Sequence, residues 1–107
     1  MRITLAPQRS DDRLDLHRAG DVLTINGTAH DFGALAEGAV LPRAAVGCDS
    51  LVSDVTRQGG VICLTLILPH GAVAPEATLF PAPLEIAADG PVALPPYEAA
   101  PEAGPDP

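Results

Sequence analysis

The three histidines of this sequence are the side chains that change charge most readily near neutral pH, which makes them the first candidates for acid–base or metal chemistry. His17 falls on the outer face of a predicted strand, and His30 falls on the apolar face of another. A metal site needs three or four ligands at characteristic spacings, and no HxH, HxxxH or CxxC sequence occurs. We therefore expect no metal and no cofactor, and interpret His30 as a histidine at the edge of the core.

His70 lies in the sequence Pro69-His70-Gly71, which directly follows the longest apolar run of the chain. Proline and glycine favour turns, and loops carry binding residues more often than strands do. We expect these three residues to form an exposed loop, and Gly71 would let a partner approach the backbone closely. They are the candidate interaction loop. The alternative is that His70 is an exposed loop residue without a role.

Cys48 is the candidate nucleophile, because it precedes Asp49 in an irregular stretch and could pair with His30 or His70. No sequence typical of a cysteine nucleophile surrounds it, so we expect no catalytic residue. Cys63 falls in a predicted strand, where it would act as a small apolar residue. The two cysteines are expected to be free thiols, because no secretion signal accompanies them.

The elements that must position these residues show apolar residues at every second position, which is typical of β-strands. A turn at Ala19-Gly20 would pair Leu16 with Leu23 in the strands on either side. The following Asn26-Gly27 predicts a type I′ turn, which pairs Leu23 with His30. Both turns place Leu23 on the same apolar face, so the sequence predicts a three-stranded meander over residues 13–32.

A second hairpin is predicted around Gly59-Gly60, with Val55 opposite Leu64 and Leu51 opposite Leu68. Leucines and isoleucines line one face of residues 61–68, and the other face is also largely apolar, which favours a central strand. Residues 3–5, 78–80 and 84–88 are further short strands. The connection 33–50 has room for a helical turn near 34–37 or 42–46.

These elements add up to an all-β fold of about eight short strands, either a small antiparallel sandwich or a partly open barrel. The composition changes at residue 95, since the run PPYEAAPEAGPDP contains five prolines, three acids and no base. Such a segment buries too little apolar surface to fold. We therefore expect a domain over residues 1–94 and a disordered acidic, proline-rich tail over residues 95–107.

The net charge of the 107-residue chain is -8, and its six basic residues are all arginines. This charge repels nucleic acid, whose binding needs clustered cations. No apolar stretch approaches the roughly 20 residues of a membrane helix, and the N-terminus lacks the apolar core of a signal peptide. We expect no nucleic acid or membrane partner, no secretion by a signal peptide, and a cytoplasmic or virion-associated location.

Three stretches carry a resemblance to a known group of proteins: residues 12–32, with GDVLTING at their centre, residues 64–71 (LTLILPHG) and residues 88–95 (ADGPVALP). They resemble small proteins encoded in bacterial prophages, in or beside tail modules. The resemblance covers most of residues 1–97 and implies a structural, assembly or accessory protein derived from a phage.

The expected function is that of a non-enzymatic structural or assembly protein of a phage or prophage. It would contact other proteins, either further copies of itself or a structural partner, through an exposed strand edge or the Pro69–Gly71 loop. The alternative is a β module that binds a small molecule or a carbohydrate.

Overall fold

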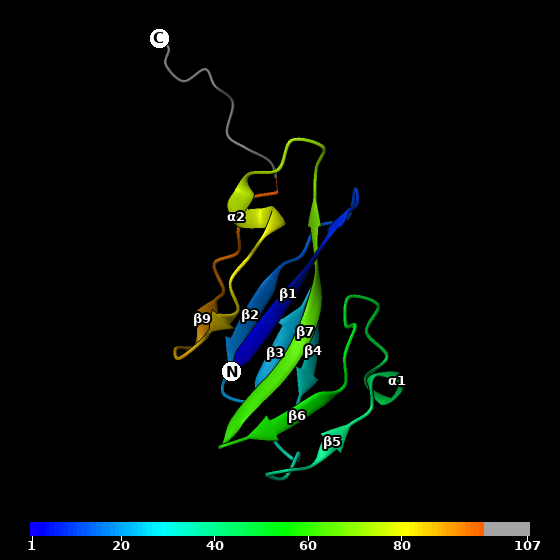
Figure 1. Cartoon of the computed structure of the whole chain (residues 1–107). Coiled ribbons are helices and arrows are strands. Elements are labelled where there is room, and N and C mark those ends of the chain that lie inside the picture. The colour runs from blue at the N-terminus through cyan, green and yellow to red at the C-terminus, as the bar shows by residue number, and fades with distance from the viewer. Residues whose placement is uncertain (98–107) are drawn as a thin grey trace.

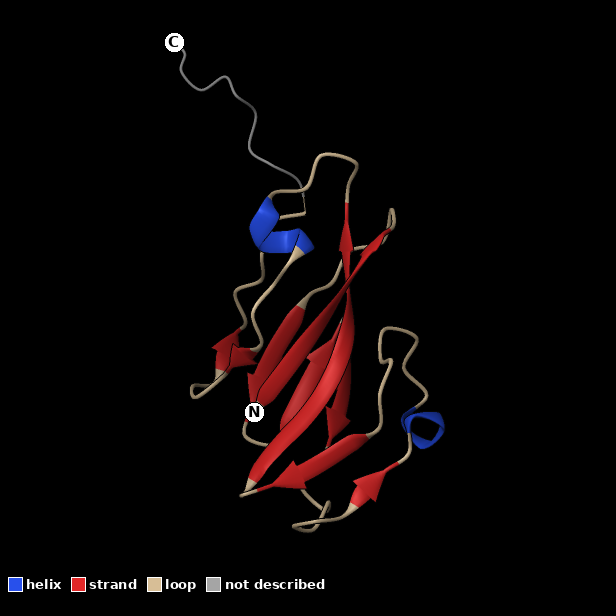
Figure 2. Cartoon of the chain, in the orientation of Figure 1, coloured by secondary structure: helices blue, strands red, loops and turns tan. Residues whose placement is uncertain are grey.

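The computed structural model describes residues 1–97; the remainder of the predicted tail, residues 98–107, lies outside the described part. Two β-sheets pack face to face and confirm the predicted all-β sandwich (Figures 1 and 2). In chain order the strands are β1 (Arg2–Arg9), β2 (Leu16–Ala19), β3 (Val22–Ile25), β4 (Thr28–Asp31), β5 (Val40–Leu41), β6 (Val55–Gln58), β7 (Val61–His70), β8 (Leu84–Glu85) and β9 (Gly90–Pro91). The first sheet has the order β5-β6-β7-β1-β8, and the second has the order β4-β3-β2-β9.

The predicted meander forms the second sheet, with one change of register. Asn26 and Gly27 have φ angles of 50° and 86°, as a type I′ turn requires, and Leu23 lies opposite His30 as predicted. The first predicted register is wrong, because the turn is Gly20-Asp21 and Leu16 pairs with Ile25 instead of Leu23. A shift of this kind, by two residues, leaves every side chain on its predicted face.

Strand β7 is central in the first sheet, as predicted, and the β6–β7 hairpin has the predicted register around Gly59-Gly60. Beyond this hairpin, Leu51 forms a bridge with Leu66, so the predicted pairing with Leu68 is wrong. The chain bulges at Ser53 and Asp54 between the two contacts. The Ser53 Oγ accepts a hydrogen bond from the Thr65 N–H at 2.9 Å, which satisfies part of the interrupted ladder.

Strand β1 is longer than predicted and pairs with β7 in the parallel direction, from Arg2 opposite Cys63 to Arg9 opposite His70. The sheet is therefore mixed, whereas the predicted sandwich is antiparallel. The same pairing extends β7 through Pro69 to His70. The predicted loop at Pro69-His70-Gly71 is consequently wrong for its first two residues, which belong to the strand.

Two short helices lie at the periphery of the sandwich (Figure 2). Helix α1 (Arg43–Val46) falls within the predicted helical turn at 42–46. Helix α2 (Glu76–Leu79) occupies the position of the predicted strand 78–80, so that prediction is wrong. Proline at 75 has a φ angle suited to a helix start, and the carboxylate of Glu76 lies in the first turn, where it interacts favourably with the helix dipole.

The core lies between the two sheets and consists mainly of aliphatic side chains. Both sheets contribute buried residues, and the inner face of β7 supplies an unbroken row of them, as predicted. Each large aliphatic side chain buried here stabilises the fold by roughly 1.5 to 3 kcal/mol. The buried apolar residues are Met1, Ile3, Leu5, Leu16, Leu23, Ile25, Phe32, Leu51, Val55, Ile62, Leu64, Leu66 and Leu68.

The folded unit extends beyond the predicted boundary at residue 94, because Pro96 and Tyr97 contact its end. The Tyr97 hydroxyl donates a hydrogen bond to the Ser10 carbonyl, and the Tyr97 carbonyl accepts one from the Gly71 N–H at 2.9 Å. The Arg13 guanidinium lies 3.3 Å from the centre of the Tyr97 ring. These contacts fasten the chain across the end of the sandwich near α2.

Candidate functional site

A groove runs beside β4, which is an edge strand of the second sheet. It consists of two adjoining cavities of about 250 and 240 Å³ that share His30 in their walls. Strand β4 lines both cavities, and the end of β3 adds Ile25 to the first. The opposite side comes from the segment 47–50 in the first cavity, and from α1 and Leu41 of β5 in the second. We call these two cavities the β4 groove.

The backbone of β4 is open along this groove. The Phe32 N–H donates to the Asp21 carbonyl, so residues at alternate positions before it, including His30, direct their backbone groups toward β3. The N–H and carbonyl groups of Ala29 and Asp31 therefore point away from the sheet. Both residues are exposed, so these groups are available to another strand.

His30 and Cys48 both line the first cavity, so the structure brings together two residues that were candidates for a Cys/His pair. The His30 ring stacks against Phe32 with 6.5 Å between ring centres and 11° between planes. Among residues 1–97, no hydrogen bond joins the Cys48 thiol to a histidine. Both cysteines are free thiols. The arrangement is therefore a groove wall with a half-buried imidazole, without the contact that activates a thiol.

The groove is acidic at its rim. Asp31 and Asp49 are exposed and line the two cavities, whereas no arginine is found among the lining residues. Carboxylates in this arrangement favour a positively charged ligand over an anionic one. The electrostatics of the groove thus agree with the negative charge of the whole chain.

The predicted interaction loop does not present its backbone to a partner. Pro69 and Gly71 are buried, and the Gly71 N–H already donates to the Tyr97 carbonyl. The half-buried His70 has its Nδ1 2.9 Å from the carbonyl oxygen of Gly71 and is not among the residues that line the β4 groove. His17 is exposed on β2, opposite Thr24.

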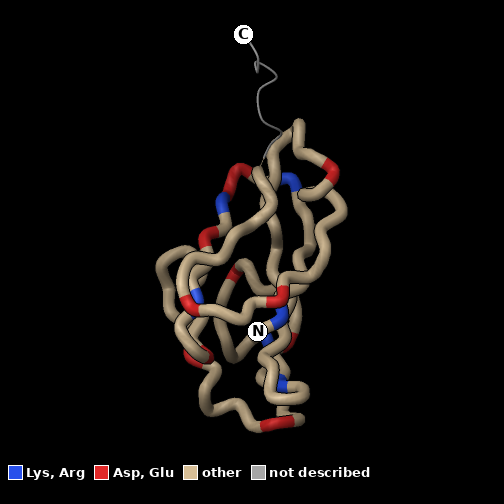
Figure 3. The backbone as a smooth tube through the Cα atoms, turned by 90° about the vertical axis from the view of Figure 1, so that its left-hand side faces the viewer, with Lys and Arg blue, Asp and Glu red and all other residues tan. Residues whose placement is uncertain are grey.

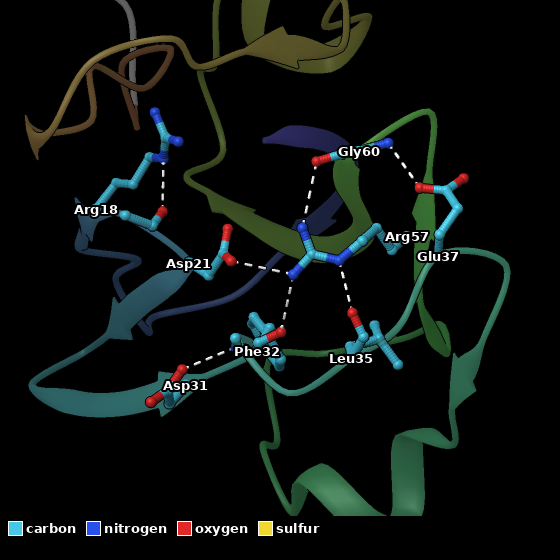
Figure 4. A network of polar contacts seen from close by, with 10 residues as sticks. Arg18, Asp21, Asp31, Phe32, Leu35, Glu37, Arg57 and Gly60 are labelled. Carbon is cyan, nitrogen blue, oxygen red and sulfur yellow. Dashed lines mark hydrogen bonds and ion pairs between the residues drawn. The ribbon is translucent and has the colours of Figure 1, made fainter.

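Arg57, on β6, braces the chain that leaves β4 (Figure 4). Its Nε donates to the Leu35 carbonyl at 2.6 Å, and its Nη2 donates to the Phe32 carbonyl at 3.2 Å and to the Asp21 carboxylate at 3.0 Å. Its Nη1 also donates to the nearby Gly60 carbonyl at 3.3 Å. The other three partners lie 22 to 36 positions away in the sequence, so no local pattern points to this role. The network fixes the end of β4 and thereby one end of the groove.

The β6–β7 turn is held from the same side by Glu37. The two carboxylate oxygens of Glu37 accept hydrogen bonds from the N–H groups of Gly59 and Gly60, each at 2.7 Å. Figure 4 shows the contact with Gly60. Because both glycines have positive φ angles, their N–H groups converge on one acceptor. Arg57 and Glu37 together attach the segment 32–37 to the first sheet.

Within residues 1–97, no three histidine, cysteine, aspartate or glutamate side chains are grouped so that they could hold a metal ion. None of the helices in that range is long and apolar enough to span a bilayer. Comparisons of the chain with family models, with curated proteins and with solved structures find no match in any of the three.

Proposed function

We propose that this chain is a non-enzymatic structural or assembly protein of a phage or prophage, and that it binds an extended segment of a partner protein along β4. The observation that carries the proposal is the open edge of β4, where the backbone groups of Ala29 and Asp31 face a groove instead of a neighbouring strand. The resemblance of the sequence to prophage proteins supports the context.

An added strand would use these backbone groups first. An extended peptide placed antiparallel or parallel to β4 can exchange hydrogen bonds with Ala29 and Asp31, because within residues 1–97 no backbone partner meets their outward N–H and carbonyl groups. Side chains on alternate residues of the peptide would enter the two cavities of the β4 groove. Backbone pairing supplies affinity in this mode, and the cavities supply selectivity.

The acidic rim favours a basic segment. Asp31 and Asp49 border the groove, so arginine or lysine side chains on the incoming strand would find carboxylates within the groove walls. Rim charges of this kind act chiefly on the association rate and on partner choice. The bound segment is therefore expected to alternate basic residues with small or β-branched ones.

The alternative of a carbohydrate-binding module has less support. Sugars are usually held against exposed aromatic rings, and the chain has three aromatic residues. Phe32 is buried, and the Tyr97 ring is covered by Arg13. Neither Tyr97 nor Phe80 lines the β4 groove, so the groove has no exposed aromatic platform for a sugar.

The proposal is tested by titrating isotope-labelled protein with a short peptide that alternates arginine and valine, with a glutamate–valine peptide as the control. We expect the amide resonances of Ala29 and Asp31 to shift with the basic peptide, and their hydrogen exchange to slow. Ala29→Pro removes an outward N–H without removing a bond to β3, and should abolish these changes. Ala29→Val keeps the N–H and serves as the matched variant.

Two results would count against binding at β4: equal shifts with both peptides, or unchanged binding by an Ala29→Pro variant that melts at the same temperature as the wild type. Concentration-dependent pairing of two copies through β4, seen by sedimentation without any peptide, would replace the partner segment by a second copy of the chain.

A further inference from the structure

A third cavity adjoins the β4 groove at the β3–β4 turn. Its volume is about 290 Å³, and it shares Asn26, Asp49 and Ser50 with the first cavity of the groove. Its other walls come from the end of β1, the segment that follows it, and the last part of β7. Apart from Ile67 and Pro69, the residues that line it are polar or charged. We call this space the polar cavity.

The polar cavity has two exposed carboxylates, Asp12 and Asp49, in its walls. Within residues 1–97, neither side chain belongs to an ion pair. The one cation among the lining residues, Arg13, is already engaged, because its Nη1 donates to the Asp11 and Asp12 carbonyls and its guanidinium lies 3.3 Å from the centre of the Tyr97 ring. Figure 3 shows acidic positions along the whole length of the molecule, with fewer basic positions among them. The cavity therefore keeps a negative charge and acceptors that suit an ammonium or guanidinium group.

The walls of the polar cavity are fixed by hydrogen bonds within the chain. The Ser10 N–H donates to the His70 carbonyl at 3.1 Å, and the Ser10 Oγ accepts a hydrogen bond from the Asp12 N–H at 3.1 Å. In another wall, the Asn26 Oδ1 accepts a hydrogen bond from the Asp15 N–H at 2.7 Å. Because these segments are ordered before a ligand arrives, little conformational freedom of their backbone is lost on binding.

The opposite end of the β4 groove is apolar. The wall of the second cavity that faces the strand is aliphatic, with Leu41 of β5 and Val46 of α1. The one carboxylate in this cavity is that of Asp31, and it already accepts a hydrogen bond from the Gly33 N–H at 2.8 Å. A basic side chain therefore meets unpaired carboxylates at the Asn26 end of the groove and largely apolar walls at the other end.

We propose that the polar cavity binds a lysine or arginine side chain of the partner segment that pairs with β4. The segment then carries its basic residue at the end of β4 next to Asn26, and an apolar residue at the end next to Phe32. Side chains on one face of an extended segment are about 7 Å apart, so successive ones enter adjoining cavities. This inference rests on the proposed function and adds a fixed place for the basic residue.

The test uses two end-blocked peptides of valine and serine that each carry one arginine, at the amino-terminal end in one and at the carboxy-terminal end in the other. Each has a nitroxide spin label beside the arginine, and together they cover both directions of pairing with β4. In the peptide that binds more tightly, the label should broaden the amide resonances of Asp12 and Asn26 in the full chain more strongly than those of Leu41 and Val46. Stronger broadening at Leu41 and Val46, or equal broadening at both ends, overturns the inference.

Asp12→Asn should weaken binding of this peptide about three- to tenfold, through loss of a charge-assisted contact. Asp11→Asn is the matched control, because it removes an equal charge from a neighbouring exposed residue that does not line the polar cavity, and should weaken binding by less than about twofold. Both variants should melt as the wild type does. A peptide with neutral citrulline in place of arginine should bind Asp12→Asn and Asp11→Asn equally.

Failure of this inference differs from failure of the proposed function. If Ala29→Pro abolishes binding of the arginine peptide while Asp12→Asn and Asp11→Asn weaken it equally, pairing along β4 stands and the place of the basic residue is wrong. If Ala29→Pro leaves binding unchanged, or if neither peptide binds the wild type, the proposed function fails and this inference fails with it.

Discussion

The Arg57 Nη2 and the Asp21 Oδ2 lie 3.0 Å apart and join β6 of the first sheet to the β2–β3 turn of the second. The Arg57 side chain is 15% exposed and the Asp21 side chain is 41% exposed, so the guanidinium is withdrawn from solvent while the carboxylate is partly open to it. The same guanidinium binds the Phe32 and Leu35 carbonyls. One side chain thus connects two sheets and the segment that follows β4, which makes it the central polar contact of the sandwich.

Arg57→Met should lower the free energy of unfolding by about 2–4 kcal/mol, because it leaves three carbonyls and a carboxylate without their donor. Arg57→Lys should lower the free energy of unfolding by less than Arg57→Met does, since an ammonium keeps the charge but cannot reach all of these acceptors at once. Urea unfolding measures the difference. Arg43→Met, on the exposed surface of α1, is the control and should change stability by less than about 0.5 kcal/mol. Equal effects of Arg57→Met and Arg43→Met would show that the network contributes nothing.

Glu37→Ala should destabilise the chain by about 0.5–1.5 kcal/mol, because the N–H groups of Gly59 and Gly60 lose a charged acceptor, although water can reach them. Glu37→Gln keeps one acceptor and should cost less. The amides of both glycines should also exchange faster with solvent in Glu37→Ala. An unchanged exchange rate would mean that the carboxylate does not hold the turn. Asp11→Ala provides the comparison, since it removes an equal charge at an exposed position.

Tyr97→Ala should destabilise the fold by about 1–3 kcal/mol, through loss of both the ring beneath Arg13 and the hydroxyl bound to Ser10. Tyr97→Phe removes the hydroxyl alone, so about 1 kcal/mol of that loss should remain. Thermal melting of the two variants separates the contributions. If both variants melted like the wild type, the Tyr97 side chain would have no part in closing this end of the sandwich.

Removal of the aromatic ring should destabilise the fold strongly at Phe32 and hardly at all at Phe80. Phe32 is 2% exposed, so Phe32→Ala creates a cavity and should cost about 3–5 kcal/mol. Phe80→Ala, at a side chain that is 79% exposed, should change stability by less than about 0.5 kcal/mol. Denaturant unfolding checks both. A large loss at Phe80 would show that its ring packs within the molecule.

The features that could be predicted from the sequence are those with a local cause. The turns at Asn26-Gly27 and Gly59-Gly60 require positive φ angles, which asparagine and glycine adopt readily. The sequence therefore predicts both hairpins at the correct positions. The parallel pairing of β1 with β7 has no local signal, because its partners are about 60 positions apart. The β4 groove forms because α1 and the segment after it lie beside β4 in the folded chain. The sequence alone could therefore name the residues that line the groove only as separate candidates, without showing that they meet.

Pro69 explains why β7 extends beyond the point where the sequence predicts its end. The Ile67 N–H donates to the Ser50 carbonyl, so two residues later the ring nitrogen of Pro69 points to the same side of the strand. The neighbouring chain has ended there, since its bridge to β7 is Leu51 with Leu66. A proline is tolerated in a strand where no partner needs its N–H. Pro69 therefore does not end β7, although proline usually terminates a strand.

The β1–β7 pairing also sets an order of events during synthesis. Strand β1 leaves the ribosome before β7, and this hydrogen-bonding partner is made about 60 residues later. The meander β2–β3–β4 can close as soon as its own short turns have emerged. Strand β1 therefore has no partner strand until β7 has been made, and β8 and β9, which pair with β1 and β2, complete the two sheets later still.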